Sequence, residues 1–189
     1  MVDGQSSIVR NAYLYTMETV KPIVNRVANS GLINIDLEDY FPQAEEIVGL
    51  DLKSFLFKEM ILREAEFREE VKKTDWKKYE GKYVVLYCSN NALIPMWAWM
   101  ILSTHLTPYA KDVACSSLEH AAEIFLYRNI ARLNKDDFAN QRVIIKGCGD
   151  RQIPEAAFVQ IAQHLSPVVQ SLMFGEACSS VPVYKKIKE

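Results

Sequence analysis

The tetrapeptide His105-Leu106-Thr107-Pro108 recurs 59 residues later in the chain as His164-Leu165-Ser166-Pro167. The same offset carries Ile94-Pro95 onto Ile153-Pro154, Val84-Val85-Leu86 onto Val143-Ile144-Ile145, and Tyr79 onto Phe138. Because all of these matches hold without a shift, we interpret residues 79–116 and 138–175 as two copies of one internally duplicated unit.

Each copy has the pattern of a β-α-β unit. Short runs rich in β-branched residues are typical of buried strands. A proline suits the first helical turn, because the N–H that it lacks has no partner there. The expected elements are strands at 83–87 and 142–146, helices from Pro95 to about His105 and from Pro154 to about His164, second strands at 112–116 and 171–174, and a linking helix at 118–133.

The rest of the chain is expected to join the same domain. Residues 32–37 and 47–52 alternate partly between apolar and polar, so they either pair with each other as antiparallel strands or add to the main sheet. Residues 61–78 are highly charged and predict a solvated helix, and the basic tail at 181–188 either lies on the sheet or on a second subunit, or frays. Because the chain has no Gly-, Ser- or Pro-rich linker long enough to divide it, the sequence predicts a single α/β domain with a mostly parallel sheet flanked by helices.

Composition narrows the class of protein. Hydrophobic residues make up 49% and charged residues 24% of the 189 residues, which is the balance of one folded globular domain. The net charge of −2 is not that of a nucleic-acid-binding protein. No secretory signal or membrane-spanning segment is recognised, because the apolar run at 96–102 is too short to cross a bilayer. We expect a cytoplasmic protein with reduced thiols, in which this run is a helix buried in the protein or against a partner, for instance in a homo-oligomer.

Three cysteines follow predicted strands. Cys88 and Cys148 come after the first strands of the two copies, and Cys178 comes after the last strand. Parallel strands of one sheet end along one edge, so the three thiols are predicted to lie along that edge. Three thiolates with one further donor, such as Asp150, Glu176 or water, suit zinc, iron or an iron–sulfur cluster. The chain has no C-x-x-C pair, so topology permits this metal site but spacing does not signal it. The remaining cysteine, at position 115, is interpreted as a small buried hydrophobic residue.

The loop after the second copy's first strand is the nearest feature to an anion-binding loop. Gly147 and Gly149 permit close approach of the backbone to a ligand, and Asp150, Arg151 and Glu176 are its polar candidates. A plain strand-to-helix turn is the alternative. His105 and His164 are expected to be structural, since they close helices at the opposite edge. No recognised nucleotide-binding or catalytic motif is present, so catalytic residues remain unknown and an enzymatic role stays open.

Several segments resemble a bacterial family of unknown function. They are residues 23–33 (IVNRVANSGLI), Ile61-Leu62-Arg63-Glu64, Lys146-Gly147-Cys148 and residues 175–182 (GEACSSVP). The resemblance covers about Pro22 to Lys186. That family is associated with gene neighbourhoods for Suf-type iron–sulfur cluster assembly, so the resemblance implies a role near iron or sulfur handling, with iron–sulfur assembly proteins as partners. It implies no catalytic residues, because no activity is established for the family.

The start of the chain departs from the family pattern. Residues 1–22 form an extension, and the single domain spans 23–189. Either Met17 is the true initiator, or the upstream residues are an amphipathic segment that packs on the domain.

The sequence is compatible with three functions. The first is an accessory factor in iron–sulfur cluster or thiol and sulfur metabolism that uses Cys88, Cys148 and Cys178. The second is a non-enzymatic protein-interaction or homodimeric structural module that uses the apolar helix. The third is a small-molecule enzyme of unknown type that uses Asp150, Arg151 or Cys148.

Overall fold

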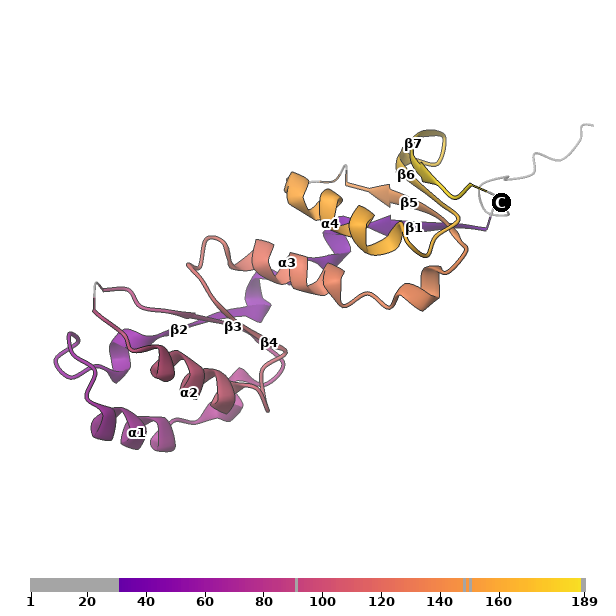
Figure 1. The fold of residues 1–189 in the computed structure, drawn as a ribbon. Helices are drawn as coiled ribbons and strands as arrows, with labels where there is room; N and C mark the ends of the chain where they lie inside the picture. Colours follow the sequence, from indigo (N-terminus) through magenta and orange to yellow (C-terminus); the bar gives the residue numbers. More distant parts are fainter. Residues whose placement is uncertain (1–30, 91, 148, 150, 188–189) are drawn as a thin grey trace, which may run out of the picture.

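The computed structural model describes residues 31–90, 92–147, 149 and 151–187 (Figure 1). The strands and α-helices follow in the order β1 (Leu32–Asp36), β2 (Ile47–Asp51), α1 (Glu64–Lys73), β3 (Tyr83–Tyr87), α2 (Met96–Leu106), β4 (Asp112–Cys115), α3 (Ala121–Ala131), β5 (Arg142–Lys146), α4 (Glu155–Leu165), β6 (Ser171–Glu176) and β7 (Ser179–Lys185). Short 3-10 helices lie between them: η1 (Leu37–Tyr40), η2 (Ala44–Glu46), η3 (Leu52–Phe55), η4 (Trp76–Tyr79) and η5 (Lys135–Phe138).

The strands form two sheets. In one, β2, β3 and β4 are all parallel. In the other, β1, β5 and β6 are parallel, and β7 pairs with β6 in the antiparallel direction. The predicted α/β class with mostly parallel strands and flanking helices is confirmed, and the basic tail does lie on a sheet.

The division into two sheets differs from the single sheet that the sequence predicts. β1 pairs with β5 and β2 pairs with β3, so the two early strands add to different sheets instead of forming an antiparallel pair. β2 covers the edge of β3 and β1 covers the edge of β5, so these two edges do not pair with each other.

Helix α3 lies between the two sheets (Figure 1). Phe125 of α3 packs with Val85 on one face of the β2-β3-β4 sheet. Leu126 and Ile130 belong to the core of the other sheet, together with Ile145. This double packing explains why apolar residues occur on more than one side of α3, and it joins the two halves.

The remaining helices each pack on one face of a sheet, and α4 shares its face with α3. α1 and α2 lie below the β2-β3-β4 sheet in Figure 1, where Phe67 and Leu102 are fully buried. α4 covers the other sheet with Ile161 and Leu165. None of the helices in the described ranges has the length and apolar character needed to cross a membrane.

Corresponding elements of the two predicted copies occupy equivalent positions. β3 and β5, α2 and α4, and η4 and η5 each begin and end 59 residues apart. The elements thus repeat in kind and length, while their origin by duplication stays a prediction. The predicted extension at residues 1–22 lies outside the described residues.

Candidate functional site

The predicted three-cysteine edge is divided between the two sheets. Cys88 follows β3, whereas Cys178 lies in the turn between β6 and β7 of the other sheet. Cys148 lies outside the described residues. The common edge expected for Cys88 and Cys178 is wrong, because that expectation assumed one sheet. Within the described ranges, no group of three or more His, Cys, Asp and Glu residues could hold a metal ion. The metal role of Cys88, Cys148 and Cys178 therefore stays a prediction.

The loop after β5 receives a carboxylate from the same chain. The backbone N–H of Arg151 donates to Oε1 of Glu38, at 2.9 Å. A Cβ at Gly149 would collide with that carboxylate, and a Cβ at Gly147 would collide with the ring of Phe158. Both glycines are therefore explained by close contacts inside the chain, which favours the turn interpretation of this loop. Asp150 lies outside the described residues.

Glu176 is engaged in an ion pair. Its Oε2 lies 2.8 Å from Nζ of Lys146, across the paired strands β5 and β6. The hydrogen bond to Glu176 is the main cause that raises the pKa of Lys146. The carboxylate that was expected as a metal donor is thus paired with a lysine.

The carboxyl edge of the β2-β3-β4 sheet carries a depression of about 600 Å³ that two thiols line, those of Cys88 and Cys115. Cys115 is exposed, so its interpretation as a buried hydrophobic residue is wrong. Cys115 lies opposite Leu86 of the neighbouring strand β3. Leu86 precedes Cys88 by two residues. Open parallel sheets bind ligands outside this edge.

The two thiols differ in their surroundings. Cys88 is half-buried, and its Sγ donates to Oδ1 of Asn90 at 3.0 Å. Partial burial raises the pKa of the Cys115 thiol, which favours the protonated form and weakens it as a nucleophile. Cys115 therefore lacks the lowered pKa of an activated catalytic thiol and fits a binding role better.

Asp51 anchors the loop beside these thiols. Its Oδ1 accepts the N–H groups of Lys53 at 2.9 Å and of Ser89 at 3.1 Å. Burial alone would raise the pKa of Asp51, but the hydrogen bonds from Ser89 and Lys53 together outweigh it and lower the pKa. The carboxylate thus holds the turn that carries Cys88.

A second depression lies at the corresponding place in the other half. It has a volume of about 280 Å³ and lies between α4, β6 and β7. Leu86, Trp99 and Cys115 line the first depression, and the residues 59 positions later, Ile145, Phe158 and Phe174, line the second. The same place is therefore hollow in both halves, with thiols and hydroxyls in one and only apolar side chains in the other.

Helix α2 exposes an apolar stripe. Leu93, Met96 and Met100 are 94%, 75% and 68% exposed, whereas the opposite side of the helix is buried through Ala98 and Leu102. The helix was expected to be buried in the protein or against a partner; burial in the protein does not hold for this stripe, because α1 and the sheet contact only the inner side.

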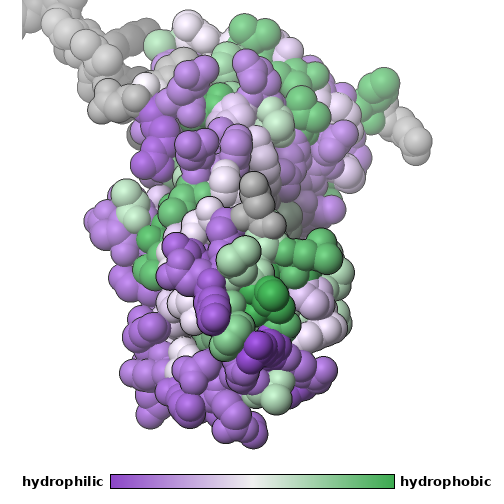
Figure 2. Space-filling model, turned by 90° about the vertical axis from the view of Figure 1, so that its left-hand side faces the viewer, coloured by the Kyte–Doolittle hydropathy of each residue, from purple (hydrophilic) through white to green (hydrophobic). Residues whose placement is uncertain are grey.

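Two more exposed apolar residues lie on a segment that is hydrogen-bonded to the loop before α2. Met60 and Ile61 are exposed on the turn before α1, and this turn is tied to the loop before α2 by a hydrogen bond from Asn90 to the carbonyl of Glu59. We call Met60, Ile61, Leu93, Met96 and Met100 the α2 surface. Figure 2 shows apolar residues gathered among hydrophilic ones on the lower half of the face that lies at the left in Figure 1.

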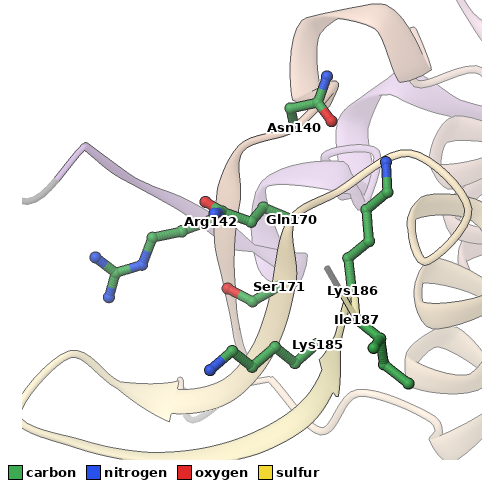
Figure 3. A pocket seen from close by; sticks show the side chains of 7 residues that line it. All are labelled: Asn140, Arg142, Gln170, Ser171, Lys185, Lys186 and Ile187. Carbon is green, nitrogen blue, oxygen red and sulfur yellow. The ribbon is translucent and has the colours of Figure 1, made fainter. Parts of the chain in front are cut away.

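A further depression, of about 1150 Å³, lies at the amino ends of β5 and β6, opposite the edge where such sheets bind ligands. Its cationic residues are Arg142, Lys185 and Lys186. Figure 3 shows that these side chains do not converge, since Lys186 points away from the other two. They form no common binding point for an anion.

The two predicted structural histidines have structural contacts. The ring of His105 stacks on Trp76, with 5.3 Å between the ring centroids. Nε2 of His164 lies 2.8 Å from the carbonyl oxygen of Leu133. Both rings therefore secure the carboxyl ends of their helices.

Comparison with known proteins gives a family. The family DUF2480, described as a protein of unknown function, matches residues 21–186. The chain belongs to the DUF2480 family. This match confirms the resemblance to a family of unknown function over nearly the whole predicted domain. Searches of curated proteins and of solved structures give no match to this DUF2480 chain.

Sequence reasoning missed three features of these sites. They are the exposure of Cys115, the contact of Glu38 with the loop after β5, and the exposure of the α2 stripe. For the stripe a signal was present, because Leu93, Met96 and Met100 recur at helical spacing while Ala98 and Leu102 face the other way. The exposure of Cys115 and the contact of Glu38 depend on the pairing of distant segments, which the sequence pattern does not reveal.

Proposed function

We propose that the protein is a non-enzymatic interaction module that forms a homodimer through the α2 surface. The observation that supports this is the group of five large apolar side chains exposed on neighbouring segments. Contiguous exposed apolar residues mark interaction sites, and methionine adapts well to a partner surface.

At two of these positions the fold does not require an apolar residue. Leu93 and Met96 of the first half correspond to Gln152 and Glu155 of the second, 59 residues later, and both of these are exposed. A helix in the same place thus tolerates polar residues on its outer side. The apolar residues of α2 therefore serve a contact outside the β-α-β unit.

The rim of the α2 surface suits a second copy of the chain. Lys58 and Glu59 precede Met60, and Arg63 and Glu64 follow Ile61. All four are exposed and carry both signs of charge. In a two-fold dimer the same patch meets itself, so a rim with both signs can be complementary to its own copy.

The test is the molar mass in solution by light scattering. We expect the double variant Met96→Glu, Met100→Glu to be monomeric, because two carboxylates on each subunit would have to be desolvated at the interface. Val159→Glu is the matched control, because Val159 is exposed on α4 at the position equivalent to Met100; it is expected to leave the dimer intact. Equal masses for the two variants would contradict the proposal.

A second candidate function is supported by the shared depression of Cys88 and Cys115. In this proposal the protein is a cytoplasmic accessory factor in iron–sulfur cluster or thiol and sulfur metabolism. Two soft thiol donors at an open sheet edge suit transient binding of zinc, iron or sulfur, with further donors from an iron–sulfur assembly partner.

Anaerobic purification followed by analysis of zinc, iron and acid-labile sulfide tests this second function. We expect bound metal or sulfide to be lost in the double variant Cys88→Ser, Cys115→Ser and kept in Cys178→Ser, which changes an exposed thiol on the other sheet. Absence of metal and sulfide from the unmodified protein would count against it.

A further inference from the structure

The depression between α4 and the β6–β7 hairpin is lined by apolar side chains alone. Ile145, Ile161 and Leu172 form its buried floor. Phe158 and Phe174 meet edge to face at its side, with 5.6 Å between the ring centroids. Its volume of about 280 Å³ is well above the roughly 150 Å³ of an apolar cavity that binds benzene.

A β-bulge forms one lip of this pocket. Leu172 pairs with Tyr184, but the next residue of β6, Met173, pairs with Pro182, so Val183 is the extra residue in β7. Val183 lines the pocket and is 55% exposed. Bulges commonly redirect a side chain beside a binding site. Here the bulge supplies a wall that the other half, a sheet of only β2, β3 and β4, does not have.

Residues on the other side keep the pocket open. A Cβ at Gly147 would collide with the ring of Phe158, so the glycine lets this ring lie over the loop after β5. Ala162 of α4 also lines the pocket with its small side chain. A larger residue at position 162 would fill the space.

We propose that this pocket binds the hydrocarbon part of an uncharged small molecule, such as an aliphatic chain of about eight carbons. The lining side chains offer carbon and thioether sulfur, so they favour neither a charged nor a strongly hydrogen-bonding ligand. Phe174, which is 38% exposed, and Val183 form the entrance. The site is separate from the α2 surface, since it lies on the other half of the chain.

Titration of the full chain with 1-octanol, followed by methyl NMR spectra, tests this proposal. We expect saturable shifts of the methyl signals of Ile145, Ile161 and Val183. In Ala162→Leu we expect these shifts to fall at least tenfold, because the added side chain occupies the pocket. The matched control is Ala156→Leu, which adds the same side chain at an exposed position of the same helix and is expected to bind as the unmodified protein does.

A second variant tests the pocket independently in case Ala162→Leu fails to fold. Val183→Asp places a charge at the exposed lip, and we expect it to fold and to bind 1-octanol at least tenfold more weakly. Absence of saturable shifts in the unmodified protein would overturn the proposal. Unchanged binding in both Ala162→Leu and Val183→Asp would overturn it as well.

Discussion

Helices α2 and α4 cover equivalent faces of their sheets, yet their outer sides differ. α2 exposes Met96 where α4 has Glu155, while Met100 and its equivalent Val159 are both apolar and exposed. The inner sides are alike, with Leu102 and Ile161 both buried. The fold therefore fixes the inner side in both halves and leaves the outer side free for function.

The depressions beside the two helices also carry different side chains at equivalent positions. Trp99 and Cys115 lie where the second half has Phe158 and Phe174. One hollow thus offers thiols, and the other offers only hydrocarbon surface. Similar backbone positions provide two different binding chemistries.

The largest expected effect comes from the shared inner side. Leu102→Ala and Ile161→Ala each remove buried methyl groups and should lower the free energy of unfolding by about 2–5 kcal/mol. Because α3 packs on both cores, we expect each variant to unfold in a single transition during urea titration.

Tryptophan fluorescence makes this a test of the link between the halves. All three tryptophans, Trp76, Trp97 and Trp99, lie in the first half. If the halves unfold together, Ile161→Ala in the second half shifts the fluorescence midpoint as much as the circular dichroism midpoint. A fluorescence midpoint that does not move would show that the halves unfold independently.

The next effect concerns an ion-pair cluster whose central carboxylate is replaced by a serine at the equivalent position of the other half. Asp112 has a nearly buried carboxylate that lies 2.8 Å from Nη1 of Arg128 and 2.9 Å from Nη2 of Arg132. The equivalent residue in the second half is Ser171. Asp112→Ser should lower the free energy of unfolding by about 1–3 kcal/mol in urea titration, because α3 loses its ionic link to β4.

Ser171→Ala is the comparison for this variant and should change stability by less than about 0.5 kcal/mol. Similar losses in the two variants would contradict the role assigned to the cluster.

A smaller loss of stability is expected from changing the residue directly after β3 or β5, which is Cys88 in one half and Gly147 in the other. Gly147→Ala brings a Cβ against Phe158, so we expect a loss of about 1–2 kcal/mol by thermal or urea unfolding. Cys88→Ala, at the equivalent position, should cost less because a side chain already fits there. The double variant Gly147→Ala, Phe158→Leu should recover part of the loss, and failure to do so would place the strain elsewhere.

The smallest effect depends on pH. Hydrogen bonds hold the pKa of Asp51 below its usual range in the folded protein, so this carboxylate stabilises the fold above about pH 4 and its contribution is lost as pH falls further. The difference in unfolding free energy between the unmodified protein and Asp51→Asn should therefore shrink on acidification. A difference that grows toward low pH would contradict the assignment.

Local patterns were sufficient to predict much of the fold. Pro95 and Pro154 mark the starts of α2 and α4, and the β-branched runs mark β3 and β5, because these features depend on nearby residues. The number of sheets was not predictable in this way. It depends on whether β1 pairs with β5 or with β2, and local periodicity carries no information about that choice.

The candidate sites were likewise predictable only in their local features. Cys88 was correctly expected after a strand, but the partner thiol in its depression is Cys115 and not Cys178. The stripe of α2 was recognised as apolar, but its exposure depends on how far α1 and the sheet extend around the helix. Side-chain chemistry was thus readable from sequence, and proximity required the pairing of distant segments.

The dependence of molar mass on concentration tests the central claim most directly. The unmodified protein should scatter light as a species of twice the 21.6 kDa chain mass at micromolar concentration and approach the mass of one chain on dilution. A mass of one chain at every concentration would contradict the assignment of the α2 surface as a dimer interface.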